Sequence, residues 1–235
     1  VGLFVFARKN SLLHFRKPVC RFKVLLNAAA NGCSEMATAL VTGIITMMFN
    51  WTMLHYVGED GVAAVTIIMY VLMFASSLYT GYSYGVAPMI SFYYGEKNRD
   101  KLKKLISISM KVILFISVLT IAASFMLTRP LVSVFASPDN PVYDLAVAGN
   151  RIGSVALLFI GFNIFASGMF TALSNGAVSA VLAFSRSFVF MLITMLVLPA
   201  VLEVNGIWLA TPVAEMMALV LSAVMFLKYR KRYRY

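Results

Sequence analysis

The chain has 235 residues, of which 61% are hydrophobic and 12% are charged. Soluble domains contain only ~45–50% apolar residues, so this composition, with a mean hydropathy of +0.86, excludes an ordinary water-soluble protein. The formal net charge of +11 would suit nucleic-acid binding. However, the basic residues lie in short connections between apolar stretches, and we expect no nucleic-acid partner.

The basic residues alternate along the chain in a regular way. Sixteen of the 20 Lys and Arg residues fall in three clusters, at 8–23, 97–104 and 228–234. The alternate connections, at 51–61, 129–145 and 200–206, contain a single basic residue, Arg129. This asymmetry is the positive-inside pattern of a multi-pass membrane protein. We therefore expect a cell-membrane protein in contact with the lipid bilayer, with its N-terminal linker and its C-terminal tail in the cytoplasm.

The first residues resemble the end of a helix. Val1–Ala7 is apolar and is followed by Arg8 and Lys9, which is the reverse of the order in a signal peptide. We expect residues 1–23 to contain the end of a preceding transmembrane helix and a basic cytoplasmic linker. The chain is therefore expected to be a fragment of a longer protein.

Six apolar segments are long enough to cross a ~30 Å hydrocarbon core. They cover 24–50, 61–94, 104–128, 145–173, 177–199 and 206–227. Starting in the cytoplasm, six crossings return the chain to the cytoplasm at the basic tail, residues 228–235. The predicted fold is all-α: an integral membrane protein whose residues 24–227 form a lobe of six transmembrane helices.

The second segment is unusually long, and a short apolar piece follows the third segment. Residues 61–94 are too long for one straight crossing and contain Pro88. They predict either a tilted, kinked helix or a shorter helix followed by an interfacial turn. Residues 131–137 are apolar but too short to span, and they predict an interfacial piece.

One carboxylate is expected deep in the first segment. Glu35 lies ~16 Å along this helix, with Asn31 one turn before it. Oxygen ligands of this kind suit an alkali cation, and a carboxylate in a dry pocket can instead carry a proton. The alternative is a buried Glu that only supports helix packing. Intramembrane carboxylates are functional by default, so we favour ion coupling.

Two further charges lie in consecutive antiparallel segments. Arg186 is ~13 Å and Glu215 ~18 Å from the cytoplasmic side by helical rise, so their side chains can meet. We expect a structural ion pair or a gating contact, because removing one partner would leave a buried charge unpaired. Asn163, near the middle of the fourth segment, is uncharged and ambiguous by itself.

The sequence contains no convincing catalytic or metal-binding constellation. Residues 81–85 match GxSxG but lie inside an apolar helix, without a strand or a His partner. Cys20 and Cys33 form no CxxC pair, so no metal site is expected. An intramembrane enzyme is therefore disfavoured. The glycine pairs 81/85 and 149/153 have the spacing of closely packed membrane helices.

Three stretches together resemble the multidrug and toxic compound extrusion (MATE) family, in its C-terminal half. They are NGCSEMATALVT at 31–42, the stretch from GEDGVAAVTIIMY through GYSYGVAPMISFYYGEKN at 58–98, and FIGFNIFASGMFTALSNG at 159–176. The resemblance covers residues 20–228. It implies one six-helix lobe of a twelve-helix secondary transporter, with the site between the lobes.

The resemblance also suggests residue roles. Glu35 occupies the position of a first-helix carboxylate used by some members for cation binding. The partner carboxylate of the fourth helix is replaced by Asn163, and a nearby Tyr by Phe159. These departures put a Na⁺ site in this lobe in doubt. The expected coupling residues are Glu35, Asn31 and Asn163.

The expected function is therefore a cation-coupled antiporter that exports lipophilic or cationic drugs and toxic compounds by alternating access. The coupling ion would be Na⁺ or H⁺, no other cofactor is expected, and the partner would be a missing N-terminal six-helix lobe. The alternative is a flippase of the same superfamily that moves lipid-linked saccharides or lipids. A further alternative is a non-transporting membrane scaffold, which predicts that neutralising Glu35 alters stability and leaves transport unchanged.

Overall fold

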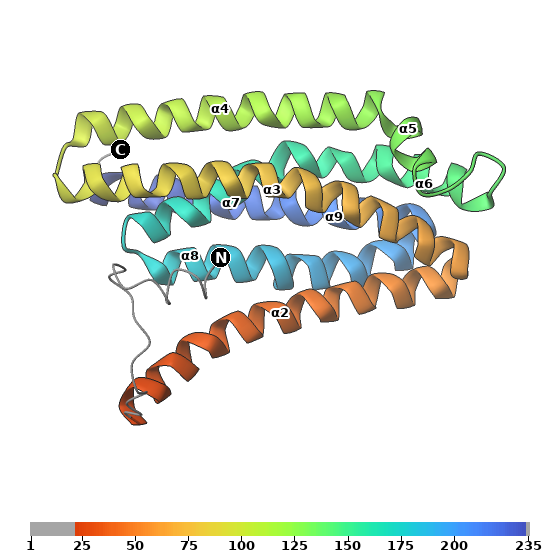
Figure 1. Cartoon of the computed structure of the whole chain (residues 1–235), viewed down its shortest axis with the longest axis horizontal. Coiled ribbons are helices and arrows are strands. Elements are labelled where there is room, and N and C mark those ends of the chain that lie inside the picture. The colour runs from red at the N-terminus through yellow and green to blue at the C-terminus, as the bar shows by residue number, and fades with distance from the viewer. Residues whose placement is uncertain (1–21, 234–235) are drawn as a thin grey trace, which may run out of the picture. The chain divides into compact units, whose positions relative to one another are not determined.

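The computed structural model describes the backbone of residues 22–233, and the side chains of residues 22, 40–230 and 233. The chain divides into two units, residues 1–40 and residues 41–235, and the packing given below is that of the second unit. Every regular element of the described residues is a helix (Figure 1). The predicted all-α class is confirmed.

The elements follow each other through short connections. In chain order they are α2 (Phe22–Tyr56), α3 (Glu59–Gly95), α4 (Arg99–Met126), α5 (Thr128–Ser133), α6 (Pro141–Gly153), the 3₁₀ turn η1 (Ser154–Ala156), α7 (Leu157–Ala172), α8 (Gly176–Phe184), the π-helix η2 (Ser185–Phe190) and α9 (Met191–Tyr233). The six predicted apolar segments lie within these helices, except that Leu127 and Leu173 are in turns. The helix α3 continues through Pro88 to Gly95, which favours the single-helix prediction over the interfacial turn.

Asparagine side chains begin three of the helices. Asn98 accepts a hydrogen bond from the Lys101 amide at the start of α4, and Asn140 accepts one from the Val142 amide at the start of α6. Asn175 does the same at the start of α8. Such caps satisfy amide groups that have no partner within the helix, so they determine where each connection ends.

The chain reverses inside α9. Arg186 and Glu215 are 29 residues apart and hydrogen-bonded, whereas one continuous helix would separate them by ~43 Å. The reversal is at Glu203, whose φ of 49° and ψ of −128° are not helical. The two arms of α9 are therefore antiparallel. The predicted connection at 200–206 contains this turn.

The helices α3 and α7 form the centre of the described bundle. The helix α3 packs against α4, α6 and α7, and α7 also packs against α8 and α9. Gly161 and Gly168 of α7 allow this close approach, because a Cβ there would lie 2.6 Å from the Tyr79 ring and 2.3 Å from Ser83 Oγ. The close contact of α3 with α7 positions the polar side chains described below.

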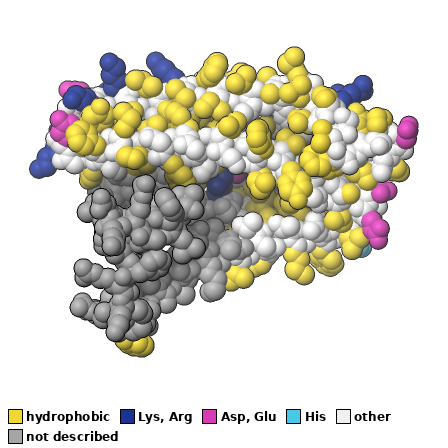
Figure 2. Space-filling model, viewed as in Figure 1, with side chains coloured by type: hydrophobic (Ala, Val, Ile, Leu, Met, Phe, Trp, Pro, Cys, Tyr) yellow, Lys and Arg dark blue, Asp and Glu magenta, His cyan; other side chains and the backbone are white. Residues whose placement is uncertain are grey.

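The outer surface of the helices is apolar. Large hydrophobic side chains such as Phe115, Leu119 and Met126 of α4 are exposed, and hydrophobic side chains cover much of the surface seen in Figure 2. Four stretches of the described residues are long and apolar enough to cross a membrane: Glu59–Gly95, Arg99–Met126, Pro141–Ala172 and Gly176–Arg230. The last of them contains the reversal at Glu203. An apolar exterior of this extent suits lipid contact, and the prediction of six crossings stays a prediction.

Candidate functional site

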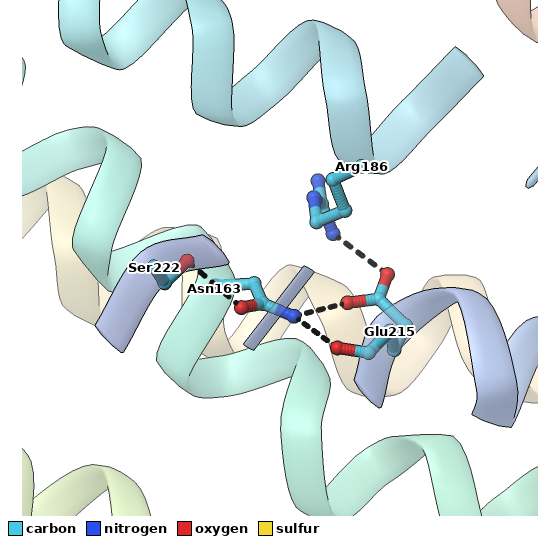
Figure 3. A network of polar contacts seen from close by, with 4 residues as sticks. All are labelled: Asn163, Arg186, Glu215 and Ser222. Atoms are coloured by element: carbon cyan, nitrogen blue, oxygen red, sulfur yellow. Dashed lines mark hydrogen bonds and ion pairs between the residues drawn. The ribbon is translucent and has the colours of Figure 1, made fainter. Parts of the chain in front are cut away.

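A network of four polar side chains lies inside the described bundle (Figure 3). Asn163 of α7 donates through Nδ2 to Oε2 of Glu215, at 2.7 Å, and to the backbone carbonyl of Glu215, at 2.9 Å. Its Oδ1 accepts a hydrogen bond from Ser222 Oγ, at 3.1 Å. Asn163, Glu215 and Ser222 are all buried. The network therefore joins α7 to the second arm of α9.

Arg186, from the π-helix η2, completes the network. Its Nη1 donates to Oε1 of Glu215 at 3.1 Å, and the two side chains are 25% and 8% exposed. The two carboxylate oxygens of Glu215 thus have different partners, a guanidinium on one side and an amide on the other. A buried charge needs such partners, because an unpaired one is expensive in an apolar medium.

The local backbone around Arg186 is unusual. Arg186 lies in the π-helix η2, Ser185–Phe190, between α8 and α9. Short π-helical segments occur mostly as single turns within α-helices, and they are frequent at functional sites. Here the segment presents Arg186 toward Glu215, as Figure 3 shows.

Next to the network lies a pocket of about 800 Å³ between α3, α7 and the α8–η2 segment. Hydroxyl side chains line it, including Ser76 and Thr80 of α3 and Ser167 and Thr171 of α7. Among the described side chains, its charged lining residue is Arg186. We call this the hydroxyl pocket. Apolar residues complete its walls, among them Pro88, Ile164 and Ala183, and the hydroxyl groups of Ser167 and Thr171 also bond to Ser179.

A second, smaller pocket of about 270 Å³ adjoins the hydroxyl pocket at Ser76 and Arg186. Its walls are mainly apolar and include Met69, Met73 and Trp208, but Arg186 and Glu215 also line it. We call this the apolar pocket. Both pockets share Arg186 and Ser76, so Arg186 borders both pockets and Glu215 borders the apolar one.

The structure brings together some of the residues predicted from sequence. Arg186 and Glu215 form the expected ion pair, and Asn163 joins them. Asn163 was expected to act with Glu35 and Asn31. The side chains of Glu35 and Asn31 lie outside the described residues, so that grouping stays a prediction.

Sequence reasoning missed Ser222 and the hydroxyl pocket. Ser222 lies seven residues after Glu215, which places both on one face of a helix. The lining residues Ser76, Thr80 and Ser83 of α3 also recur at helical spacing. That periodicity was the available signal, but Ser and Thr attract little notice in an apolar helix because they can bond to the backbone of their own turn.

The MatE family model matches residues 35–197. This range covers most of the chain, including α3 to α8 and Asn163. The chain belongs to the MatE family. The MATE resemblance drawn from its motifs is therefore confirmed, and the chain is a multi-pass membrane protein. No curated protein matches it.

Solved MATE structures have the same fold. An inward-facing multidrug resistance MATE family transporter of the MOP superfamily matches with a TM-score of 0.84 at 20% identity, over 99% of this chain and 54% of that chain. The outward-facing form of such a transporter matches with a TM-score of 0.78 at 20% identity, over 99% and 52%.

A third match is a MOP superfamily transporter from Pyrococcus furiosus, described as having a binding pocket of reverse polarity that suggests a different function. Its TM-score is 0.79 at 19% identity, over 99% of this chain and 52% of that chain. At such identities the likeness shows the fold alone. This MATE chain spans about half the length of the solved transporters that it matches.

Proposed function

We propose that the chain is one lobe of a cation-coupled antiporter that exports lipophilic or cationic compounds from the cell by alternating access. The observation that carries the proposal is the Asn163–Glu215–Arg186 network, buried in a membrane-spanning bundle of the MATE family and bordered by two pockets. Ionisable groups at membrane depth are costly, and they mark ion or substrate pathways.

Coupling needs a group that binds an ion with different affinity in the two states. We assign that role to Glu35, with Asn31 as its neighbour and Asn163 as a polar partner, and with Na⁺ or H⁺ as the ion. Arg186 and Glu215 then hold the second arm of α9 against η2 and form either a structural contact or a gate. The second six-helix lobe would close the substrate pathway from the other side.

The test is ethidium efflux from cells that express the complete transporter. Glu35→Gln keeps the size of the side chain and removes its charge. We expect this variant to lose efflux while its thermal stability stays that of the wild type. The matched control is Glu96→Gln, the same chemical change at an exposed position in the α3–α4 connection, and it should transport normally. Wild-type efflux in Glu35→Gln would remove Glu35 from coupling.

A second candidate is a flippase of the same superfamily. The observation that favours it is the guanidinium of Arg186 on the wall of the hydroxyl pocket, since guanidinium groups bind phosphates well. A flippase predicts no ethidium efflux even from the wild type, and phosphate-dependent movement of a lipid between leaflets.

A further inference from the structure

The lining of the hydroxyl pocket does not match a simple cation. Among the described residues its lining includes Arg186 but no Asp or Glu. Within this described lining, a ligand therefore meets a guanidinium, whose charge is balanced by Glu215 from the adjoining apolar pocket. The hydroxyl groups of Ser76, Thr80 and Ser167 can donate or accept hydrogen bonds, so they are compatible with an oxyanion.

Arg186 has hydrogen-bonding capacity to spare. A guanidinium carries five N–H donors, and Arg186 has one hydrogen bond to the described residues, from Nη1 to Glu215. Its side chain is 25% exposed and lines both pockets. The remaining donors can therefore bind a second carboxylate without breaking the contact with Glu215.

Charge balance further restricts the net charge of the ligand. The Arg186–Glu215 pair is neutral, so a bound anion would leave one net negative charge inside the membrane, which is costly. A zwitterion brings no net charge. Its carboxylate can pair with Arg186 while its positive group stays among the hydroxyl side chains or near Glu215.

The apolar pocket provides space for the rest of such a molecule. It adjoins the hydroxyl pocket at Arg186 and Ser76, and its walls include Met69, Met73 and Trp208. Flexible Met side chains adapt to apolar groups of different shapes. A molecule with a carboxylate at Arg186 can thus direct an apolar body into this second pocket.

We propose that Arg186 is the specificity-determining residue of a site for small zwitterionic amphiphiles, whose carboxylate it binds at the boundary of the two pockets. This inference rests on the proposed transport function, because it names the substrate class of the same pockets. It changes the expected preference from cations in general to compounds that also carry a carboxylate.

The test compares two dyes that differ at one group. Rhodamine B is a zwitterion with a free carboxylate, and rhodamine B ethyl ester has the same chromophore but is a cation. Binding to the purified complete transporter in lipid nanodiscs is measured by fluorescence anisotropy, with no ion gradient. We expect the wild type to bind rhodamine B about tenfold or more tightly than the ester, as a charge-assisted contact predicts.

Variants then assign the preference to Arg186. The paired variant Arg186→Met with Glu215→Gln removes both charges and leaves none unpaired, so it should fold and bind the two dyes within about twofold. Arg186→Lys keeps the charge but not the planar fork, and it should retain part of the preference. Arg151→Met is the matched control, because Arg151 is exposed and lies outside both pockets.

Three results would overturn the proposal: equal binding of the two dyes by the wild type, binding of neither dye, or a full preference in the paired variant. A failure of the proposed export function can be distinguished from these three results. If ethidium efflux is absent but the dye preference depends on Arg186, the site stands and the export function fails. If efflux is present without a preference, the site assignment fails alone.

Discussion

At the scale of single residues, the partners of Glu215 explain why a carboxylate is tolerated inside this bundle. Its two oxygens are bound by Arg186 and Asn163, and Asn163 is bound in turn by Ser222. Each member is thus held by at least one other. Buried polar networks are favourable only when such bonds are complete, and a single truncation leaves a neighbour unsatisfied.

Arg186→Met should therefore destabilise the protein by about 3 kcal/mol, because it leaves the buried charge of Glu215 without its cation. Adding Glu215→Gln should recover most of this loss, since Asn163 can still donate to the new amide. Thermal unfolding of the purified protein in detergent measures both effects. The exposed Arg151→Met should change stability by less than ~0.5 kcal/mol. A paired variant no more stable than Arg186→Met would show that the loss is not electrostatic.

The sequence predicted the members of this network better than their contacts. Arg186, Glu215 and Asn163 were noticeable because charged and amide groups are rare in apolar segments. Helical rise placed the first two at similar depth, and they do meet. The family resemblance instead predicted that Asn163 acts with Glu35. No sequence pattern indicated that Asn163 contacts Glu215. Which faces of two helices meet depends on their rotation and tilt, and a single sequence does not encode these directly.

At the scale of helices, small residues determine where elements approach closely. A Cβ at Gly149 would lie 2.7 Å from Ile68 Cδ1 and 2.8 Å from the Trp208 ring, whereas none of the described residues comes within 4 Å of a Cβ at Gly81 or Gly85. The glycine spacing therefore predicted close packing correctly at 149/153, where Gly153 approaches Ile68. At 81/85 the prediction of close packing was wrong for contacts among the described residues. The spacing is the same in both pairs, so the two cases differ only in whether another helix packs against the glycines.

Gly149→Ala should accordingly cost about 1–3 kcal/mol, because a tightly packed site must shift to accept a methyl group. Gly81→Ala is the matched control, and it should be neutral or slightly stabilising, since Ala favours the helix over Gly. Chemical or thermal unfolding of both variants gives the comparison. Equal stability of the two would mean that α6 and Trp208 do not pack as the structure shows.

The reversal in α9 contains a strained residue. Glu203 has a φ of 49° and a ψ of −128°, a sparsely populated conformation that favours glycine and costs another residue roughly 1–3 kcal/mol. The nearest glycine in the chain, Gly206, does not have this conformation. Gly206 instead lies against the Leu198 carbonyl, where a Cβ would be 2.2 Å from the oxygen. The position of the turn within 200–206 was therefore not predictable from turn preferences alone.

Glu203→Gly should raise the free energy of unfolding by about 1 kcal/mol, because glycine adopts this conformation without strain. Glu203→Ala removes the same carboxylate but keeps the strain, so it should show no such gain. The difference in melting temperature between the two variants isolates the backbone effect. A gain of equal size in both would assign it to the loss of charge.

At the scale of the whole molecule, the distribution of charge predicts its orientation. The described basic residues cluster at the α3–α4 connection, at 97–104, and in the last turns of α9. The connections at the other ends of the same helices contain mainly acidic residues, namely Glu59, Asp60, Asp139, Asp144 and Glu203. Hydropathy and charge were sufficient to locate the apolar helices, because these patterns are set by the bilayer. They do not encode which faces of the helices pack together.

Single-cysteine labelling tests the orientation in intact cells, after Cys20 and Cys33 are replaced by Ser. A cysteine introduced at Asp139 should react with a membrane-impermeant maleimide, because its connection is predicted to face outward. A cysteine at Glu96 should react only after the cells are permeabilised. The opposite pattern would reverse the predicted topology.

The most direct test of the proposed function is transport by the complete protein in liposomes. When the interior is loaded with Na⁺ or acidified, antiport predicts that ethidium accumulates inside, and that it does not accumulate without a gradient. Glu35→Gln should remove this accumulation, while Glu96→Gln should leave it intact. Uptake of the same size without any gradient, or no uptake by a folded wild type under either gradient, would contradict coupled export.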